Sequence, residues 1–363
     1  MEVKKIITPD LREGMRIAKD VYSDDNHLIV TGGTAVTAKI ISNLERYGVP
    51  IVSVYVATGQ GDTYEEIQRP NLRSHIEAVK NTEEFKKFNH RFLDGVGELK
   101  DIMDSVVKRN IEVDEEVLIG EVESIISKSR NSLHMLDMMN SMRDYDDLTY
   151  VHMVNVSLLC HIIGESIGMS EGDLRVLTMA GLLHDIGKLK IPESIIKKPD
   201  KLSKIEYDIV KKHTILGYQL LKDKKLDNRI KAAALMHHER CDGSGYPAGV
   251  TLHKIDFFSR IVAIADVYDA MTADRVYRKG ICPFDVISDF EKNGMSQYDP
   301  RCLLPFLDKT AMSYINNEVR LSNNAEGKVV MINKYSLSRP IVQVDTTFID
   351  LTKNPNIRIS HVV

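Results

Sequence analysis

The sequence predicts a multidomain protein in which a central all-α domain is flanked by a small N-terminal α+β module and a small C-terminal β module. Two observations indicate this architecture. Apolar residues recur at three-to-four spacing through the middle of the chain, whereas short β-branched runs separated by turn residues occur near both ends. In addition, 363 residues exceed the usual size of one compact domain, so two or three units are expected.

The N-terminal module is predicted at residues 1–62. It contains extended runs such as LIVTGGTAV, a helical stretch TAKIISNLERYG in which Gly48 stands at the C-cap position, and a β-branched strand IVSVYVA. Residues 63–124 follow as a charge-rich segment with helical spacing of its apolar residues. We interpret this segment as a helical connector whose charges face solvent.

The central all-α domain is predicted at residues 125–317. Its apolar runs, among them VSLLCHIIGESI, VLTMAGLL and RIVAIADVYDAM, are separated by turn signals, of which CDGSGYPAG is the clearest. From residue 318 the pattern changes to VVMIN, PIVQVD and IRISHVV, around loops that contain Gly, Asn and Pro. These runs predict the strands of a β appendage at residues 318–363.

Composition excludes several classes of protein. The chain has 48 Lys and Arg against 52 Asp and Glu and no long basic stripe, which disfavours binding to a nucleic-acid polymer. No stretch approaches the roughly 20 apolar residues of a membrane span, and the N-terminus lacks the apolar core of a signal peptide, so a cytoplasmic location is expected. The four cysteines form no CxxC pair and indicate neither a thiolate zinc site nor a disulfide framework.

Metal-type ligands recur along the predicted all-α domain. An unpaired aspartate is costly to bury, yet one follows the apolar run MAGLL and another follows IVAIA, so each must be paired or bind a cation. A buried histidine at any one position is commonly a hydrogen-bonded core residue. Five histidines and two aspartates together favour a catalytic Mn, Fe or Zn site instead. The candidates are His152, His184, Asp185, His213, His237, His238 and Asp266.

Three further positions are singled out by helical spacing. Lys188 lies four residues after His184, so a helix continuing through HDIGK would place its ammonium beside the ligands, where a phosphate could bind. An exposed lysine is the alternative. Asp269 and Thr272 follow Asp266 at three-residue steps and are expected to support it, although Asp269 could equally be a surface charge.

The segments HDIGK, HHERCDGSGYP and ADVYDAMTADRVYR, in this order, resemble the HD-GYP family, a branch of the HD phosphohydrolases. The similarity covers roughly residues 125–315. It implies an HD-type helical fold for the central domain. It also implies a metal-dependent phosphodiesterase that converts cyclic di-GMP to pGpG, and in many members further to GMP, by attack of a metal-bridging hydroxide. The metals of the family are iron or manganese, and some members prefer cyclic GMP-AMP.

The resemblance also implies roles for single residues. His152, His184, Asp185 and Asp266 would surround one metal, and Asp185 would bridge to a second metal. By the same resemblance, the second metal would be held by His213, His237 and His238. Lys188 would contact the scissile phosphate, and Arg275 would lie near the substrate phosphates. The cavity wall would be shaped or supported by Gly245, Tyr246 and Pro247.

Two positions depart from the family's pattern. Members with a third metal carry Glu four residues before the first ligand histidine, whereas this chain has Leu148, so two metals are expected. Cys241 stands where an aromatic residue is usual, which indicates either altered base stacking or a tolerated packing change. Adjacent His237 and His238 cannot share a face of a regular helix, so a helix should end there.

Three alternatives stay open at this point. The chain could be an HD hydrolase of another nucleotide, such as cyclic GMP-AMP, a dNTP or an alarmone. It could also be a catalytically inactive receptor that binds cyclic di-GMP and signals through its flanking modules. A structural interaction protein is the third alternative, and it would leave the His/Asp set unexplained. A protein partner or a homodimer formed through those modules is left open as well.

Overall fold

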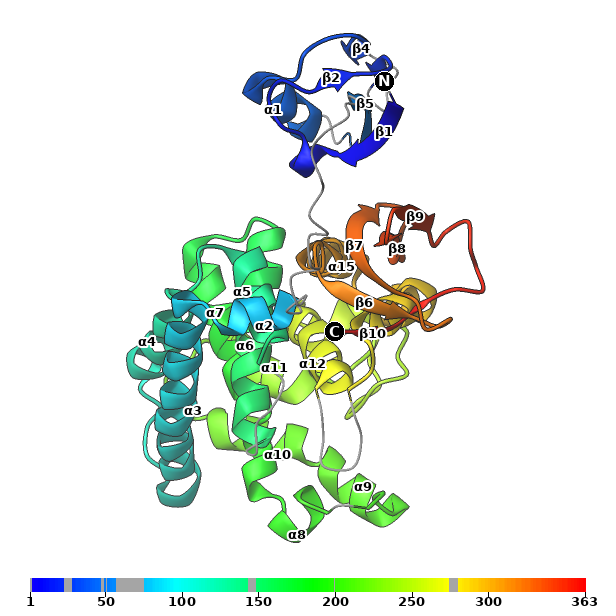
Figure 1. Cartoon of the computed structure of the whole chain (residues 1–363). Coiled ribbons are helices and arrows are strands. Elements are labelled where there is room, and N and C mark those ends of the chain that lie inside the picture. Colours follow the sequence, from blue (N-terminus) through cyan, green and yellow to red (C-terminus); the bar gives the residue numbers. More distant parts are fainter. Residues whose placement is uncertain are drawn as a thin grey trace. The chain divides into compact units, whose positions relative to one another are not determined.

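The computed structural model describes residues 2–22, 28–46, 49, 51–56, 75–142, 148–198, 200–273 and 280–363 (Figure 1). The chain divides into two compact units, residues 1–72 and 73–363. Gly48 and Arg275, to which the sequence assigns roles, lie outside the described residues.

The first unit is a small α+β module. A three-stranded sheet has the order β1-β5-β2, in which the antiparallel strands β1 (Glu2–Ile7) and β5 (Ile51–Val56) pair along their whole length. The other elements are η1 (Thr8–Asp10), β2 (Arg16–Ile17), the paired β3 (Val21–Tyr22) and β4 (Leu28–Val30), and α1 (Ala38–Arg46). Ile17, Leu44 and Val52 are buried in its core.

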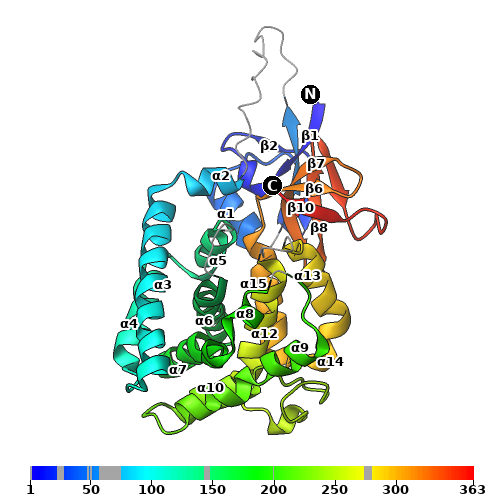
Figure 2. The ribbon, with the colours of Figure 1, turned by 90° about the horizontal axis from the view of Figure 1, so that it is seen from below.

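The second unit begins with α2 (His75–Lys80), α3 (Glu83–Arg109) and α4 (Glu115–Ile126). Side-chain caps define the starts of the last two helices, because Thr82 accepts from Phe85 N and Asp114 accepts from Val117 N. Asn110 ends α3 in the left-handed conformation that often closes a helix. Figure 2 shows α3 and α4 side by side along one flank of the helical body.

The helices that follow form most of that body. Their bounds are α5 (Ser132–Asn140), α6 (Leu148–Ser166), α7 (Glu171–Leu183), η2 (Ile186–Lys190), α8 (Glu193–Ile196), α9 (Lys204–Lys211), α10 (His213–Leu221), α11 (Asn228–Met236), η3 (Leu252–Lys254), α12 (Phe257–Thr272), α13 (Pro283–Asp289), the π-helix η4 (Phe290–Gly294), α14 (Met295–Gln297) and α15 (Pro300–Ser313).

Helices α6, α7 and α12 pack against one another at the centre of the helical body. Their apolar residues are buried on nearly every side, which explains why these segments read as almost continuous apolar runs. Gly181 allows the close packing of α7 on α6, since an added Cβ would lie 2.9 Å from the Cα atom of Ser157. The polar candidates on these helices are therefore held by a closely packed apolar core.

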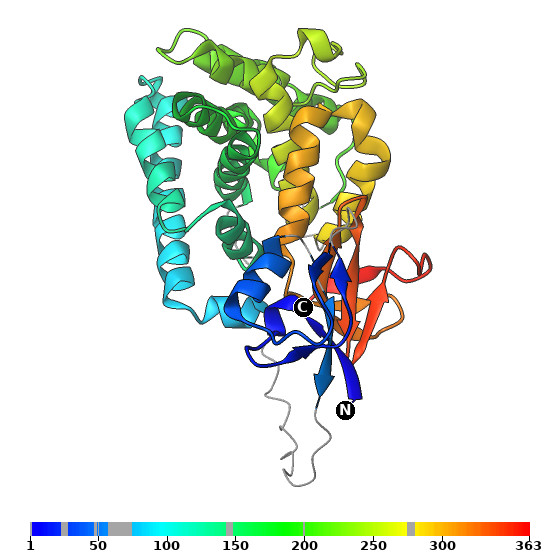
Figure 3. The same cartoon turned by 90° about the horizontal axis from the view of Figure 1, so that it is seen from above.

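The chain ends in a five-stranded antiparallel sheet of order β10-β6-β7-β8-β9. Its strands are β6 (Glu318–Leu321), β7 (Glu326–Asn333), β8 (Ser336–Val344), β9 (Thr347–Asp350) and β10 (Ile359–Val362). Phe284 of α13 and Tyr314, which follows α15, share a buried cluster with Val319 and Val342 of the sheet. Figure 3 shows this sheet beside α13 and α15.

The coarse prediction of the fold is confirmed: in chain order, a small N-terminal sheet is followed by a mostly helical region and then by a C-terminal sheet. The strands predicted from VVMIN, PIVQVD and IRISHVV correspond to β7, β8 and β10. The finer domain limits at residues 62, 124 and 317 stay predictions. Within the described residues, no helix combines the length and apolar character needed to cross a bilayer.

Candidate metal centre

His184 and Asp185 lie where α7 ends, and not inside a longer helix. The helix stops at Leu183, and the chain continues as the 3₁₀-helix η2. The condition that an α-helix continues through HDIGK is therefore not met. Lys188 nonetheless approaches the centre, because the tighter turn brings its ammonium onto the Asp185 carboxylate.

Glycine at position 187 lets this turn contact α10. An added Cβ on Gly187 would overlap the backbone carbonyl oxygen of His213, and it would also crowd the amide nitrogen of Gly217. The resulting close approach places the Asp185 carboxylate next to the His213 imidazole at the start of α10.

All seven predicted ligands converge in the structure. They come from α6, the end of α7, the start of α10, the end of α11, and α12. Within each of two groups, one ligand atom from every member lies within 4.8 Å of the others, and the groups are Asp185, His213, His237 and His238, and His152, His184 and Asp266. Helix α11 ends at Met236, which confirms the predicted helix end at the two adjacent histidines.

The Asp185 carboxylate faces both groups. Its Oδ2 lies 3.5 Å from Nε2 of His152 and 3.3 Å from Nε2 of His184. Its Oδ1 lies 3.2 Å from Nε2 of His213 and 3.6 Å from Nε2 of His237. This is the geometry of a carboxylate that could bridge two cations.

Asp266 also spans the two groups. Its Oδ1 lies 3.1 Å from Nε2 of His152, while its Oδ2 lies 3.6 Å from Nδ1 of His238. Asp266 and Asp185 are both buried. Two buried carboxylates surrounded by imidazoles form an oxygen and nitrogen donor set, which suits a divalent transition metal.

Backbone hydrogen bonds orient three of the imidazoles. In each, Nδ1 donates to a carbonyl oxygen, so that Nε2 presents its lone pair to the centre, as is usual for metal-binding histidines. The bonds are His184 to Gly181 (2.6 Å), His213 to Val210 (2.6 Å) and His237 to Ala233 (2.9 Å). Among the residues that the structure describes, Nε2 of His184 and Oδ1 of Asp185 are buried and have no hydrogen-bond partner, so the residues fit bound cations.

The environment keeps most imidazoles neutral. Burial is the largest influence on the pKa of His184, His213 and His238 and lowers all three, that of His213 to about 4. For His152, burial is opposed by hydrogen bonds to two carboxylates, which outweigh it and raise the pKa to about 9. A cation that binds His152 must therefore displace a proton.

Both carboxyl groups are held ionised. Burial disfavours the charge on Asp185, but the ammonium of Lys188 and the neighbouring His184 outweigh it and keep the pKa of the carboxyl well below its usual range. The hydrogen bond from His152 does the same for the pKa of Asp266. Ionised carboxylates are the form that coordinates divalent cations, so both groups can act as ligands.

A cavity of about 540 Å³ opens beside the centre. His152, Asp185 and Lys188 line it from the centre, and residues from α6 and from the α8–α9 segment complete its wall. Its volume lies within the ~300–1,000 Å³ typical of small-ligand pockets.

Residues 122–302 match the HD domain family. Similar proteins include a cyclic di-GMP phosphodiesterase of Pseudomonas aeruginosa, 33% identical over 229 residues (62% of this chain and 54% of that protein). A cyclic di-GMP phosphodiesterase response regulator of Xanthomonas campestris is 33% identical over 210 residues (57% of this chain and 54% of that protein). A 3'3'-cGAMP-specific phosphodiesterase of Vibrio cholerae is 40% identical over 147 residues (40% and 34%).

This chain belongs to the HD domain family, in its HD-GYP branch. It spans about half the length of the first two relatives. Its fold is similar to that of an HDG"Y"P protein from Bdellovibrio bacteriovorus, with a TM-score of 0.51 and 20% identity, covering 85% of this chain and 99% of that one. HD domain phosphohydrolases bind divalent metals, which agrees with the donor set.

Asp269 supports a different ligand of the HD-GYP centre from the one expected. Its Oδ2 lies 2.7 Å from Nδ1 of His152. The Thr272 hydroxyl donates to the carbonyl oxygen of Tyr268 at 2.8 Å, within its own helix. Helix α12 rotates Asp269 toward α6, which spacing along one helix could not reveal.

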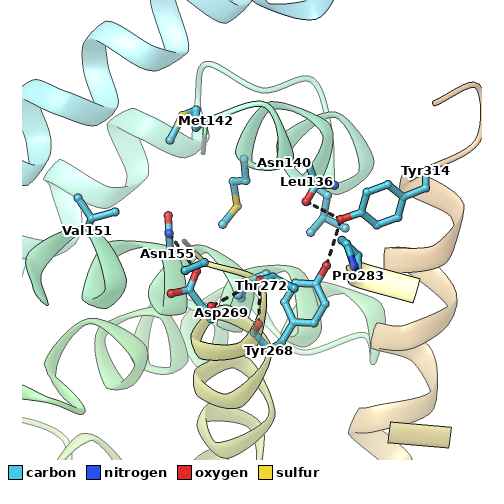
Figure 4. Close-up of a pocket in the computed structure, with 13 residues that line it drawn as sticks. Leu136, Asn140, Met142, Val151, Asn155, Tyr268, Asp269, Thr272, Pro283 and Tyr314 are labelled. Atoms are coloured by element: carbon cyan, nitrogen blue, oxygen red, sulfur yellow. Dashed lines mark hydrogen bonds between the residues drawn. The ribbon is translucent and has the colours of Figure 1, made fainter. Parts of the chain in front are cut away.

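Asn155 is the third member of the group formed with Asp269 and His152, and this role was not predicted from the sequence. Its Nδ2 donates to Oδ1 of Asp269 at 3.0 Å, so one carboxylate joins Asn155 to His152. Figure 4 shows Asn155 and Asp269 facing each other at a small pocket. Asn155 lies three residues after His152 on α6, a spacing that could have indicated a shared partner.

We expect Asn155→Ala to weaken metal binding or turnover by about 10- to 100-fold, because His152 loses its fixed orientation. Metal content after dialysis against graded chelator measures the effect. Asn293→Ala is the matched control, since Asn293 donates to Asp289 at 2.8 Å on an exposed surface. Equal metal retention in the two variants would contradict the positioning role of Asn155.

The loop that contains Gly245, Tyr246 and Pro247, here called the GYP loop, contacts the HD-GYP centre at His238. The Tyr246 ring stacks on the His238 imidazole with centroids 4.6 Å apart. Gly245 packs against the backbone of His238, where a Cβ would overlap the carbonyl oxygen. Tyr246, Gly245 and Pro247 do not line the 540 Å³ cavity, so the structure favours support of its wall over contact with a base.

Glu239, also missed in the sequence, fixes this loop. Its buried carboxylate accepts from Ala248 N at 2.7 Å and from Val250 N at 3.1 Å. The sequence feature that could have indicated this role is the position of the glutamate, directly after the His237–His238 pair and before a turn. Cys241 hydrogen-bonds through its backbone to Gln297 and does not line the cavity, which favours the packing explanation of that departure.

Glu239→Gln should lower the free energy of unfolding by about 1–3 kcal/mol, because an amide NH₂ would face one of the two backbone N–H groups. Thermal and denaturant unfolding would measure the change. Glu193→Gln, at an exposed glutamate paired with Lys197, should remain close to wild type. Identical stabilities of the two variants would show that the Glu239 carboxylate does not hold the loop in place.

Proposed function

We propose that this chain is a metal-dependent phosphodiesterase that hydrolyses a cyclic dinucleotide, with cyclic di-GMP as the primary substrate and pGpG, and then GMP, as products. The single observation that carries the proposal is the Asp185 carboxylate, whose two oxygens face two separate histidine groups beside a nucleotide-sized cavity. The names of the similar proteins support this choice of substrate class.

The cofactors in this proposal are two divalent ions, iron or manganese. His152, His184 and Asp266 would hold one, and the second would be held by the group of His213, His237 and His238, with Asp185 shared by both. When bound, such a pair lowers the pKa of water toward neutrality and offsets negative charge on phosphate oxygens.

The protein's own groups orient and bind the substrate in this proposal. Lys188 lines the cavity and its ammonium lies on the Asp185 carboxylate, so it can bind a non-bridging oxygen of the scissile phosphodiester. The side chains of His184 and Asp185 are fully buried, which fixes their positions beside the cavity. Water adds to the phosphorus atom, the bond from phosphorus to the 3'-oxygen of the neighbouring nucleotide breaks, and the 3'-oxygen leaves as a hydroxyl that carries the proton given up by the water. A cytoplasmic location and a protein partner or homodimer through the flanking modules belong to the same proposal.

Anaerobic purification, metal analysis and a substrate panel would test the function. The panel contains cyclic di-GMP, 3'3'-cGAMP, a dNTP and an alarmone, and chromatography identifies the products. We expect about two metals per chain and preferred turnover of a cyclic dinucleotide. Two metals with tight binding of cyclic di-GMP but no cleavage would make the chain a receptor. Preferred hydrolysis of the dNTP or alarmone would overturn the substrate class.

A further inference from the structure

The cavity beside the metal centre has a second charged wall, formed by the segment from α8 to α9. Lys198, Lys201 and Tyr207 of this segment line the cavity. The ion pairs and hydrogen bonds of these residues show which of them have a structural role and which can face a ligand.

Two of the three lysines of the cavity are already paired. Lys188 lies on Asp185, and the ammonium of Lys198 lies 2.8 Å from both carboxylate oxygens of Glu206. Glu206 in turn forms the capping box of α9, so Lys198 belongs to the fold. Lys201 is exposed and has no ion pair or hydrogen bond within the described part of the chain.

The acidic residues around the cavity do not neutralise Lys201. Asp185 belongs to the metal centre, and Asp269 bonds to His152 and Asn155. Asp200 is exposed and lies beside Lys201 in sequence, yet it forms no ion pair with it. The Lys201 ammonium is therefore available to an anion that enters the cavity.

Tyr207 offers an aromatic face at the same wall. It is 49% exposed although it lines the cavity, and its phenol hydroxyl has no hydrogen-bond partner among the described residues. The Lys211 ammonium, which pairs with Asp208 at 2.7 Å, lies 5.3 Å from the ring centroid. Tyr207 and the unpaired Lys201 line the same cavity, and an aromatic ring together with a cation is the combination with which proteins bind a nucleobase and its phosphate.

We propose that this wall binds the half of a cyclic dinucleotide that is not cleaved, with Lys201 on the second phosphate and Tyr207 stacked on a base. The inference rests on the proposed function. A cyclic dinucleotide carries two phosphodiesters and two bases, and the metal centre with Lys188 engages one phosphodiester. The cavity volume of about 540 Å³ leaves room for further contacts.

The test compares cyclic di-GMP with bis(p-nitrophenyl) phosphate, which has one phosphodiester and no nucleobase. The measured quantity is kcat/KM for cyclic di-GMP divided by kcat/KM for the aryl ester. Lys201→Ala should lower this ratio at least about tenfold, mainly through KM, because a charge-assisted contact is lost. Lys201→Arg should restore most of it, and Lys204→Ala, at an exposed lysine outside the cavity, should leave the ratio unchanged.

Tyr207 is tested in the same assay. Tyr207→Ala should lower the ratio about fivefold or more and Tyr207→Phe should keep it, because stacking needs the ring and not the hydroxyl. Tyr218→Ala, at an exposed tyrosine of α10, is the control. An unchanged ratio in Lys201→Ala, or an equal loss with both substrates, would overturn the assignment.

The same variants separate this inference from the proposed function. If the wild type cleaves the aryl ester but no cyclic dinucleotide, equilibrium binding of cyclic di-GMP replaces turnover. Binding that weakens about tenfold in Lys201→Ala would then retain the subsite and reject the activity. A wild type that neither cleaves nor binds a cyclic dinucleotide would reject both.

Discussion

Asp185→Ala should abolish turnover, with a loss on the order of 10³-fold or more, and should deplete both metals together. The reason is geometric: one oxygen of this buried carboxylate faces His152 and His184, and the other faces His213 and His237. Its removal takes away the carboxylate that both groups share, leaves Asp266 as the remaining carboxylate of the two groups, and removes charge that balances the cations. Metal analysis and an assay of cyclic di-GMP cleavage measure the two effects.

Asp223→Ala is the matched control for this variant, because Asp223 is 87% exposed in its side chain and lies outside both ligand groups. It should retain full metal content and turnover. A single metal lost from Asp185→Ala, with the other retained at wild-type affinity, would contradict the bridging role. Full turnover in Asp185→Ala would reject the centre as the catalytic site.

Gly187→Ala should destabilise the protein by about 1–3 kcal/mol and weaken metal binding. An added Cβ would overlap the carbonyl oxygen of His213 and crowd the amide nitrogen of Gly217. Both are backbone atoms, so no side-chain rotation can relieve the overlap, and η2 must move away from α10. That movement separates Asp185 from His213, now 3.2 Å apart between Oδ1 and Nε2. Thermal unfolding and metal analysis give the result.

The same substitution at Gly120 provides the control. Gly120 lies within α4, and an added Cβ there would meet no neighbouring atom. Gly120→Ala should therefore stabilise the protein by about 0.5–1 kcal/mol, through the better helix propensity of alanine. A Gly187→Ala variant as stable as wild type, with both metals bound, would show that η2 and α10 do not depend on close contact.

The sequence indicated the seven candidate donors that the structure brings together, because each stands in a local pattern. Apolar runs before Asp185 and Asp266 indicated buried carboxylates, and the adjacent His237 and His238 indicated a helix end, which α11 has at Met236. The 3₁₀-helix that follows HD in HDIGK could not be predicted, since periodicity does not distinguish an α-helix from a 3₁₀-helix over five residues.

The roles of supporting residues could not be predicted in this way. Asp269 contacts His152 across 117 residues of chain, and Asn155 meets Asp269 across 114. Both contacts depend on how α12 rotates against α6. The sequence could place Asp269 and Thr272 near Asp266 along one helix, but the direction of each side chain is a property of the packed pair.

The sequence by itself determined that a helical domain carries a histidine and aspartate set, because helical periodicity and the HDIGK and HHE segments are local features. The tertiary structure decided which carboxylate oxygen faces which imidazole, which backbone carbonyls fix the Nδ1 protons, and which lysine of the cavity remains unpaired. These facts depend on distances of a few ångströms between helices that are far apart in the chain. Only the packed core, in which α6, α7 and α12 have one mutual arrangement, sets such distances.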